Sequence, residues 1–355
     1  MLTIILLIKN KKEQMSIEKQ ANNLVDKIKE TSKNEENNKN KSNLPKNKNE
    51  KELLKDKTNN KFGPFLKYPN QNNGYILDLE SMDEKELFSK NNIFISFINQ
   101  RMTKYLQKSL INASKETIDY ILDELKGTFR EVIKNKNGNY FCSNLIKVSN
   151  KINRVKILTE LSGFLNEDCT DQFGTYPIQN LIELASGEDE FNLLLISFND
   201  SDKILIPALN ANGTFVIQKL IKHIPENLRT QFNNIFVNFV SILARDTYGA
   251  YALEKFIQYT KNDQIQKQIL NTIMNDFINI STNKNGNYLI QNLLEKWWNN
   301  KKGENLKKVI NSKFSILSKN VYSYYVCALY IRLSKSDQQK ETDKTTINIS
   351  KKNHK

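Results

Sequence analysis

The sequence has few of the residues from which catalytic and metal sites are built. Its 355 residues include only three cysteines and two histidines, and the cysteines form no Cys-x-x-Cys pair. A zinc site with the usual ligand spacing therefore cannot form, and no Gly-x-x-x-x-Gly-Lys loop is present to hold phosphates. His223 has no nucleophile or carboxylate in register with it. We expect no enzyme, no metal site and no cofactor.

Long hydrophobic runs are also missing. The apolar stretch from Leu2 to Ile8 is too short to span a bilayer and lacks the flanks of a signal peptide, so we expect no membrane association. Residues 33–60 are too polar to bury a core, and the residues after Ser334 have a similar composition. The sequence thus predicts disordered tails over residues 1–61 and 334–355, around a folded domain over residues 62–333.

The charge balance favours a polyanion partner only weakly. The net charge is +14 and the pI is near 9.3, values typical of nucleic-acid-binding proteins. Residues 1–60 carry +5 of this charge and residues 334–355 carry +3, which leaves +6 for the segment between them. More than half of the excess positive charge thus lies on the predicted tails. Separately, the three unpaired cysteines suit the reducing environment of the cytoplasm.

One nine-residue block recurs at steps of 36 to 39 residues. Full copies, such as Gly-Asn-Tyr-Phe-Cys-Ser-Asn-Leu-Ile, begin at Gly138, Gly174, Gly213, Gly249 and Gly286, and degenerate copies begin at Met102 and Tyr322. An Asn or Asp stands three residues before six of the seven blocks, where it suits a helix cap. Regular repetition of helical segments predicts an all-α solenoid of about seven repeats.

The first residue of each block, which is the glycine in full copies, is position 0, and the following residues are positions 1 to 8. Positions 3, 4, 7 and 8 are nearly all apolar and form one helical stripe, which we expect to be buried. We place positions 1, 2 and 5 on the opposite face, where packing does not explain them. Position 1 holds Thr103, Asn139, Thr175, Thr214, Ala250, Asn287 and Ser323; position 2 holds Lys104, Tyr140, Tyr176, Phe215, Tyr251, Tyr288 and Tyr324; position 5 holds Gln107, Ser143, Gln179, Gln218, Glu254, Gln291 and Cys327.

These three positions match the needs of a ligand made of stacked planar groups. Positions 1 and 5 lie one helical turn apart, so that two short polar side chains can meet the edge of one planar group. The ring at position 2 stands beside them, where it can slide between neighbouring planar groups. A single such aromatic residue would more often belong to a core, but seven copies in register favour a binding surface. Stacked bases, each read on its edge, fit this arrangement.

The blocks resemble the repeats of the Pumilio/FBF (PUF) family, in which each repeat reads one RNA base. The resemblance covers about residues 85–333. It implies a right-handed crescent of three-helix repeats whose concave face holds single-stranded RNA antiparallel to the protein. It also implies a cytoplasmic monomer that binds elements in messenger 3′ untranslated regions and represses translation or promotes decay, with protein co-repressors on the convex face.

The resemblance also implies a base code. In the family, Asn with Gln reads uracil, a small residue with Gln reads adenine, and a small residue with Glu reads guanine. Ala250 with Glu254 would then read guanine, and Asn287 with Gln291 would read uracil on its 5′ side. The repeats of Thr214 and Thr175 would follow with adenine, although the first of these two bases is also compatible with uracil.

The chain departs from the family at several places. The family usually has eight repeats, and the seventh block here is compatible with either a base-reading repeat or a C-terminal cap. Ser143 stands where Gln is usual, and Lys104 stands where a ring is usual. Lys108, Lys219 and Lys255 directly follow position 5 and are candidates for RNA phosphate contacts, although a solvated helix face explains them equally well.

Two other functions fit parts of the pattern. One is a PUF-like ribosome-biogenesis protein that holds structured RNA without a base code. The other is an armadillo- or HEAT-like scaffold that binds peptides. The registered Asn, Ser, Gln and Glu residues persist in at least five blocks, which argues against the first alternative, and the recurrent Gly-small-aromatic-x-x-Gln block argues against the second.

Overall fold

The computed structural model describes residue 79 and residues 81–352, with side chains up to Asp337. All the repeats lie within one compact unit, Met82–Lys355. The predicted N-terminal tail, residues 1–61, lies outside the described residues, as do residues 62–78 of the predicted domain.

This unit is built from three-helix repeats, and residues 81–352 contain no strand. Each full repeat has an outer helix, a short middle helix and a block helix that carries the recurring sequence. The first three repeats are α3 (Glu84–Leu87), α4 (Lys90–Ser96) and α5 (Gln100–Ile111); α6 (Lys115–Leu125), α7 (Phe129–Lys134) and α8 (Gly138–Val148); and α9 (Lys151–Leu161), α10 (Leu165–Asp168) and α11 (Thr175–Leu184).

The later repeats follow the same order with two variations. The fourth, fifth and sixth are α12 (Glu188–Ile196), α13 (Ser201–Ala208) and α14 (Gly213–His223); α15 (Arg229–Phe236), α16 (Val240–Arg245) and α17 (Thr247–Tyr259); and α18 (Asp263–Asn275), α19 (Phe277–Ser281) and α20 (Gly286–Trp297). The fifth adds two 3-10 turns, η1 (Glu226–Leu228) and η2 (Val237–Phe239). The last has a single long helix, α21 (Lys301–Leu317), before α22 (Ser323–Lys352).

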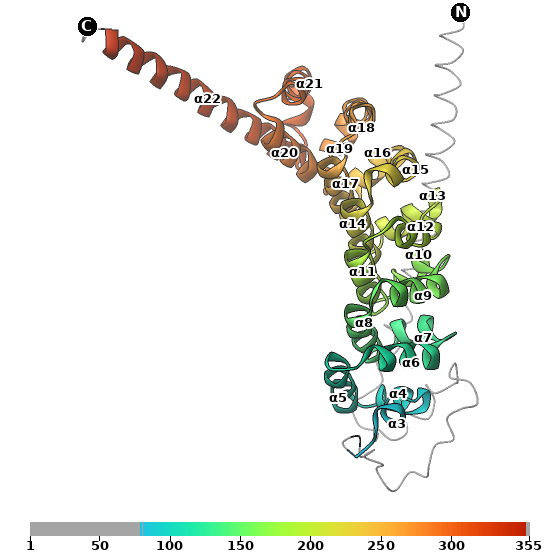
Figure 1. Cartoon of the computed structure of the whole chain (residues 1–355). Helices are drawn as coiled ribbons and strands as arrows, with labels where there is room; N and C mark the ends of the chain where they lie inside the picture. The colour runs from blue at the N-terminus through green and yellow to red at the C-terminus, as the bar shows by residue number, and fades with distance from the viewer. Residues whose placement is uncertain (1–78, 80, 353–355) are drawn as a thin grey trace, which may run out of the picture. The chain divides into compact units, whose positions relative to one another are not determined.

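The repeats stack as a solenoid, because each block helix packs against the block helices before and after it. The contacts run in the order α5, α8, α11, α14, α17, α20 and α22. Figure 1 shows α5, α8, α11, α14 and α17 in one column with outer helices beside it, while α22 extends away from the end of the column. The predicted apolar stripe is confirmed: Val216, Ile217, Leu220 and Ile221 in α14 are each at most 1% exposed. Burial of one such side chain stabilises a fold by about 1.5–3 kcal/mol.

The predicted caps at the block helices are also confirmed. Asn135 Oδ1 accepts hydrogen bonds from the backbone N–H groups of Asn137 and Gly138, both at 2.9 Å. Asp171, Asn210, Asp246 and Asn283 make the same pair of bonds in their repeats. Each cap satisfies two N–H groups that the first helical turn leaves free.

The glycine that opens each block permits a close helix crossing. A Cβ atom added to Gly138 would lie 2.7 Å from the carbonyl oxygen of Val132, six residues earlier at the end of the middle helix. At Gly213 the carbonyl oxygen of Pro207 lies at the same distance. Any side chain here would push the block helix away from the middle helix, and this explains why glycine recurs.

The last block begins one residue later than the sequence suggested. Asn320 Oδ1 caps the N–H groups of Tyr322 and Ser323, and Ser323 Oγ donates to the carbonyl of Leu317, six residues earlier. Ser323 therefore occupies the place of the block glycine, and its hydroxyl bonds to the type of carbonyl that the glycines abut. Counting from Tyr322 was wrong by one residue, because that count relied on a regular step and not on the cap.

The C-terminal boundary predicted at residue 333 does not mark the end of helical structure. Helix α22 continues to Lys352, across residues that we expected to be disordered. The packed first turns of α22 provide the helix nucleus, which is the step with the largest free-energy cost, so that each further helical residue adds little cost. The chain also contains no Gly or Pro after Gly303 that would stop the helix. Trp298 Nε1 of the neighbouring block, which donates to Asp337 Oδ2 at 2.5 Å, holds the helix past residue 333.

Neither membrane-spanning helices nor disulfides are found in the part of the chain that the structure describes. No single helix there is long and apolar enough to cross a bilayer, and α13 with α14 meets the length and composition requirement only as a pair bent by 117°. Cys142, Cys169 and Cys327 are buried free thiols. Burial, with a smaller contribution from Glu160, raises the pKa of Cys142 to about 12, so this side chain acts as an apolar core residue.

Candidate nucleic-acid interface

Five aromatic rings form a series along the exposed side of adjacent block helices. Tyr140, Tyr176, Phe215, Tyr251 and Tyr288 are between 54% and 66% exposed, and all five occupy position 2. Equivalent positions on stacked helices share one face, which we call the block-helix face and define by positions 2, 5, 6 and 9. Since these rings take little part in the core, they remain free to stack on a ligand. Lys104, at position 2 of the first repeat, is exposed on the same face.

The prediction that position 1 lies on an exposed face is wrong. Six position-1 side chains of the sequence count are at most 2% exposed, namely Thr103, Asn139, Thr175, Thr214, Asn287 and Ser323. At about 100° per residue, position 1 lies only about 20° from position 8, so it belongs to the edge of the buried stripe. These side chains bond within the protein: Thr175 Oγ1 donates to Asn212 O at 3.0 Å, and Thr214 Oγ1 donates to Tyr248 O at 3.1 Å.

In three repeats, the side chain at position 1 instead orients the side chain at position 5 by accepting a hydrogen bond from it. The amide nitrogens of Gln179 and Gln218 donate to the position-1 hydroxyls of Thr175 and Thr214 at 3.1 and 3.3 Å. Gln291 Nε2 similarly donates to Asn287 Oδ1 at 3.0 Å. These three glutamines are half-buried, and each retains its carbonyl oxygen for a ligand. Gln179 and Gln218 also retain one N–H group, whereas Gln291 Nε2 makes a second, longer hydrogen bond to the Asn287 carbonyl at 3.4 Å. The buried residue thus fixes the direction of the amide that faces outward.

Two position-5 side chains are held by the following repeat. Gln107 Oε1 accepts from Asn144 Nδ2 of α8 at 3.4 Å. Glu254 follows Ala250, which has no polar side-chain atom, and its Oε1 accepts from Lys296 Nζ of α20 at 2.5 Å. The carboxylate predicted to read guanine is therefore paired with a lysine 42 residues further along the chain.

The repeat with Ser143 has a hollow on the block-helix face. Its volume is about 300 Å³, and its lining includes Tyr140, Ser143 and Tyr176 together with the amides of Asn144 and Gln179. Ser143 is shorter than the glutamine found at position 5 of other blocks and is 9% exposed. The serine therefore leaves polar space between two exposed rings.

The candidate phosphate-binding lysines differ in their surroundings. Lys108 is exposed and Lys255 is half-buried, whereas Lys219 Nζ pairs with Glu183 of the preceding block helix. Sequence reasoning missed Lys147 and Lys222, two exposed residues at position 9. Position 9 shares a helix face with positions 2 and 6, so extending the count past the nine-residue block would have found them.

The corrected register changes the assignment of the last repeat. Tyr325, which is 58% exposed, takes position 2 in place of Tyr324. Ala328 takes position 5 in place of Cys327, so no polar side chain stands where other repeats present an amide or a carboxylate. This arrangement fits a C-terminal cap better than a base-reading repeat.

His223 lies at the end of α14, after Lys219 and Lys222, and gives the stability of the fold a pH dependence. Its Nε2 atom is buried without a hydrogen-bond partner among the described residues, and burial, followed by Lys222 and Lys219, lowers its pKa. A group with a lowered pKa in the folded state binds protons more readily when unfolded, so stability falls as the pH drops below the ordinary histidine range. We expect thermal unfolding between about pH 7 and pH 5 to show a steeper loss of Tm for the natural protein than for His223→Gln. Equal slopes would show that His223 does not contribute.

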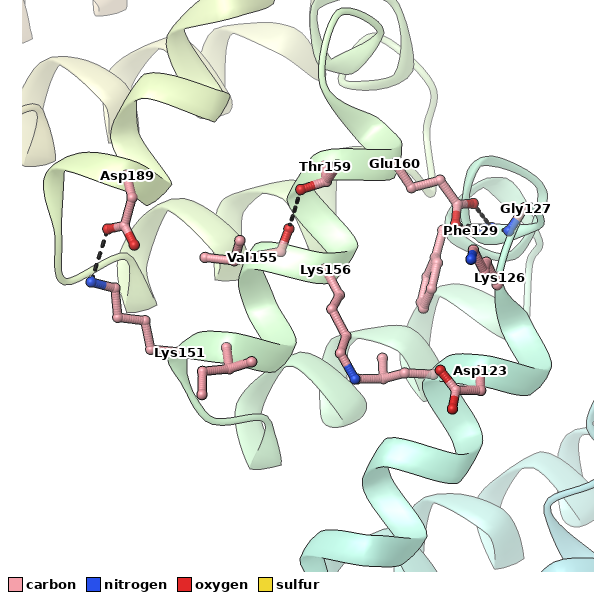
Figure 2. A pocket seen from close by; sticks show the side chains of 12 residues that line it. Asp123, Lys126, Gly127, Phe129, Lys151, Val155, Lys156, Thr159, Glu160 and Asp189 are labelled. Atoms are coloured by element: carbon pink, nitrogen blue, oxygen red, sulfur yellow. Dashed lines mark hydrogen bonds and ion pairs between the residues drawn. The ribbon is translucent and has the colours of Figure 1, made fainter.

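A larger hollow lies away from the block-helix face. Its volume is about 850 Å³, and it is lined by Leu122, Phe129, Ile152 and Val155 and by several charged residues on or next to the outer helices. Figure 2 shows the charged side chains around it. Most of the charged side chains are engaged within the protein, as in the ion pair of Lys151 with Asp189 and the bonds from the Gly127 and Phe129 N–H groups to Glu160. Residues 79 and 81–352 contain no group of three His, Cys, Asp or Glu side chains that could hold a metal ion.

Comparison with known proteins agrees with this geometry. The sequence profile of the Pumilio-family RNA-binding repeat matches residues 105–126, 169–195, 208–232, 240–274 and 276–297. Pumilio homolog 12 of Arabidopsis thaliana is 25% identical over 211 residues, which cover 58% of this chain and 35% of that protein. A Pumilio domain-containing protein of Schizosaccharomyces pombe is 29% identical over 135 residues, covering 36% of this chain and 16% of the relative. The chain thus spans well under half the length of the curated relatives that it matches.

Solved structures share the fold. The RNA-binding domain of yeast Puf5p bound to AAT2 RNA superposes with a TM-score of 0.62 at 20% identity, over 72% of this chain and 71% of that one. The Puf4 RNA-binding domain bound to the HO endonuclease RNA 3′ UTR recognition sequence gives a TM-score of 0.59 at 19% identity, over 65% and 72% of the two chains. The stacked three-helix repeats thus define an α-solenoid. Together with the recurring repeat sequence, which the profile matches, they show that the chain contains Pumilio-family (PUF) repeats.

Proposed function

We propose that this protein binds single-stranded RNA sequence-specifically along the block-helix face, with one base per base-reading repeat. The observation that carries the proposal is the run of five exposed rings at position 2 of adjacent helices. Stacking of a base on an aromatic side chain contributes about 1–3 kcal/mol. Five such platforms support nanomolar affinity, equivalent to about −12 kcal/mol, after ordering costs.

The held side chains at position 5 supply the base preference. An amide offers both a donor and an acceptor to a base edge, whereas a carboxylate only accepts. The Asn287–Gln291 repeat then reads uracil and the Glu254 repeat reads guanine, so the RNA contains a 5′-UG step antiparallel to the protein. The protein acts as a cytoplasmic binding module without catalytic activity. It regulates the translation or stability of messengers that carry this element in a 3′ untranslated region.

Selection from a random RNA pool tests this proposal. We expect the full chain to enrich unstructured sequences that share a UG step, and to bind them more tightly than scrambled RNAs at equal salt. Enrichment of stem-loops without a common sequence would instead favour a structured-RNA function. A peptide panel provides the comparison with a protein-binding scaffold, and preferred capture of peptides over RNA would contradict the proposal.

The lysines that follow position 5 should act without regard to base sequence. We expect the triple variant Lys108→Ala, Lys219→Ala and Lys255→Ala to weaken binding to all RNAs alike, because phosphate contacts position the strand but do not read it. Each contact to single-stranded nucleic acid adds about 0.7 to the slope of log K against log salt, so the slope should fall by about 2. Titrations at several salt concentrations measure it. An unchanged slope would remove these lysines from the interface.

A further inference from the structure

Position 5 of the guanine repeat is fixed differently from position 5 of the three repeats with Gln179, Gln218 and Gln291. Gln179, Gln218 and Gln291 are each held by the position-1 side chain one turn earlier in the same helix. Ala250 stands at position 1 of the Glu254 repeat and has no polar atom to offer. Lys296 Nζ, from the next block helix, makes the only hydrogen bond to the Glu254 side chain among the residues that the structure describes.

We infer that Lys296 is a positioning residue, which sets the base preference of the Glu254 repeat by holding its carboxylate toward the RNA. This inference rests on the proposed function and assigns a task to a residue outside positions 1, 2 and 5. The lysine replaces, from the neighbouring repeat, the support that position 1 gives elsewhere.

The geometry leaves room for guanine beside the lysine. An ionised carboxylate offers about four lone-pair sites, and Lys296 occupies one of them, on Oε1. The remaining sites, including both on Oε2, can accept the N1–H and N2–H groups of a guanine edge. Lys296 therefore restrains the carboxylate without blocking it.

The charge of Lys296 has a second effect on the same carboxylate. RNA brings phosphates to the block-helix face, and their negative field opposes an ionised glutamate nearby. The ammonium group compensates this repulsion, and the ion pair is partly screened from solvent, since the Glu254 side chain is 31% exposed and that of Lys296 is 51% exposed. Without the lysine, Glu254 would be free to rotate and would meet the RNA as an uncompensated anion.

The test uses the full chain and four RNAs that differ only at the guanine base. Lys296→Met removes the charge but keeps an unbranched side chain. We expect it to reduce the preference for guanine over adenine by about five- to tenfold, mostly through weaker binding of the guanine RNA, because ordering a free glutamate on binding is unfavourable. Lys296→Arg should retain most of the preference, since it restores a cation to the same carboxylate.

Lys255→Met is the matched control. Lys255 follows Glu254 on the same helix, and no hydrogen bond or ion pair joins the two side chains among the described residues, since Glu254 pairs with Lys296. We expect this control to weaken all four RNAs equally. In a Glu254→Gln background, Lys296→Met should produce no further loss of guanine preference.

The outcomes separate the inference from the proposed function. A natural protein without any guanine preference at this base would overturn the proposed reading of the repeat, and the role of Lys296 with it. If the natural protein prefers guanine and Lys296→Met leaves that preference unchanged, Lys296 has no positioning role. A stronger preference in the variant would mean that the lysine competes with guanine, which also overturns the inference.

Discussion

Replacing Glu254 by glutamine is expected to abolish the preference for guanine at one base of the bound RNA. The carboxylate only accepts hydrogen bonds, and the Watson–Crick edge of guanine presents two donors. An amide turns one acceptor into a donor, which faces a guanine N–H group unfavourably. Loss of one base-edge contact costs about 1–3 kcal/mol on the original RNA, or roughly 5- to 150-fold in Kd. Kd values for four RNAs that differ only at this base measure the effect.

Glu183→Gln is the control for this substitution. Glu183 is also an acidic residue of the block-helix face and pairs with a lysine of the next block helix, but it lies at position 9, away from the base-reading positions. We expect the control to shift all four affinities together. If the natural protein does not prefer guanine, or if Glu254→Gln keeps the preference, either the register or the base assignment is wrong.

Much of the fold followed from the sequence because each repeat encodes its own local structure. The cap at Asn135, the glycine at position 0 and the apolar stripe all lie within about a dozen residues of one another in the sequence. Each feature alone indicates a helix only weakly, but their recurrence in every full repeat made the prediction clear. The exposure of the rings at position 2 followed from the same helical geometry. In the structure Tyr140, Tyr176 and Tyr288 are all more than half exposed, as a binding surface requires.

Features that depend on neighbouring repeats escaped prediction. The burial of position 1 follows from its small angle to position 8, but the carbonyls that accept from its threonine hydroxyls, those of Asn212 and Tyr248, lie at the start of the next block. The pairing of Lys296 with Glu254 joins residues of different repeats, and no local pattern marks it. The start of the last block at Ser323 follows from its bond to Leu317, whereas an alignment by spacing alone admits either residue.

Replacing Tyr288 by alanine is expected to weaken RNA binding while leaving the fold almost unchanged. Its ring is 66% exposed, so the core loses little apolar contact, and alanine is the residue most favourable in a helix. RNA would lose one stacking platform, which contributes about 1–3 kcal/mol. Because every base has an aromatic face, the loss should be similar whichever base occupies the site. Binding titrations with several RNAs and thermal unfolding of the free protein measure the two effects.

Leu289→Ala separates a binding residue from a core residue at adjacent positions of the same helix. Leu289 is 3% exposed, and deletion of a buried leucine side chain typically costs about 2–5 kcal/mol of stability. We expect this variant to unfold at a clearly lower temperature, and to bind RNA with near-natural affinity wherever it remains folded. A Tyr288→Ala protein that unfolds as readily as Leu289→Ala would place Tyr288 in the core. One that keeps both its Tm and its RNA affinity would remove this ring from the binding surface.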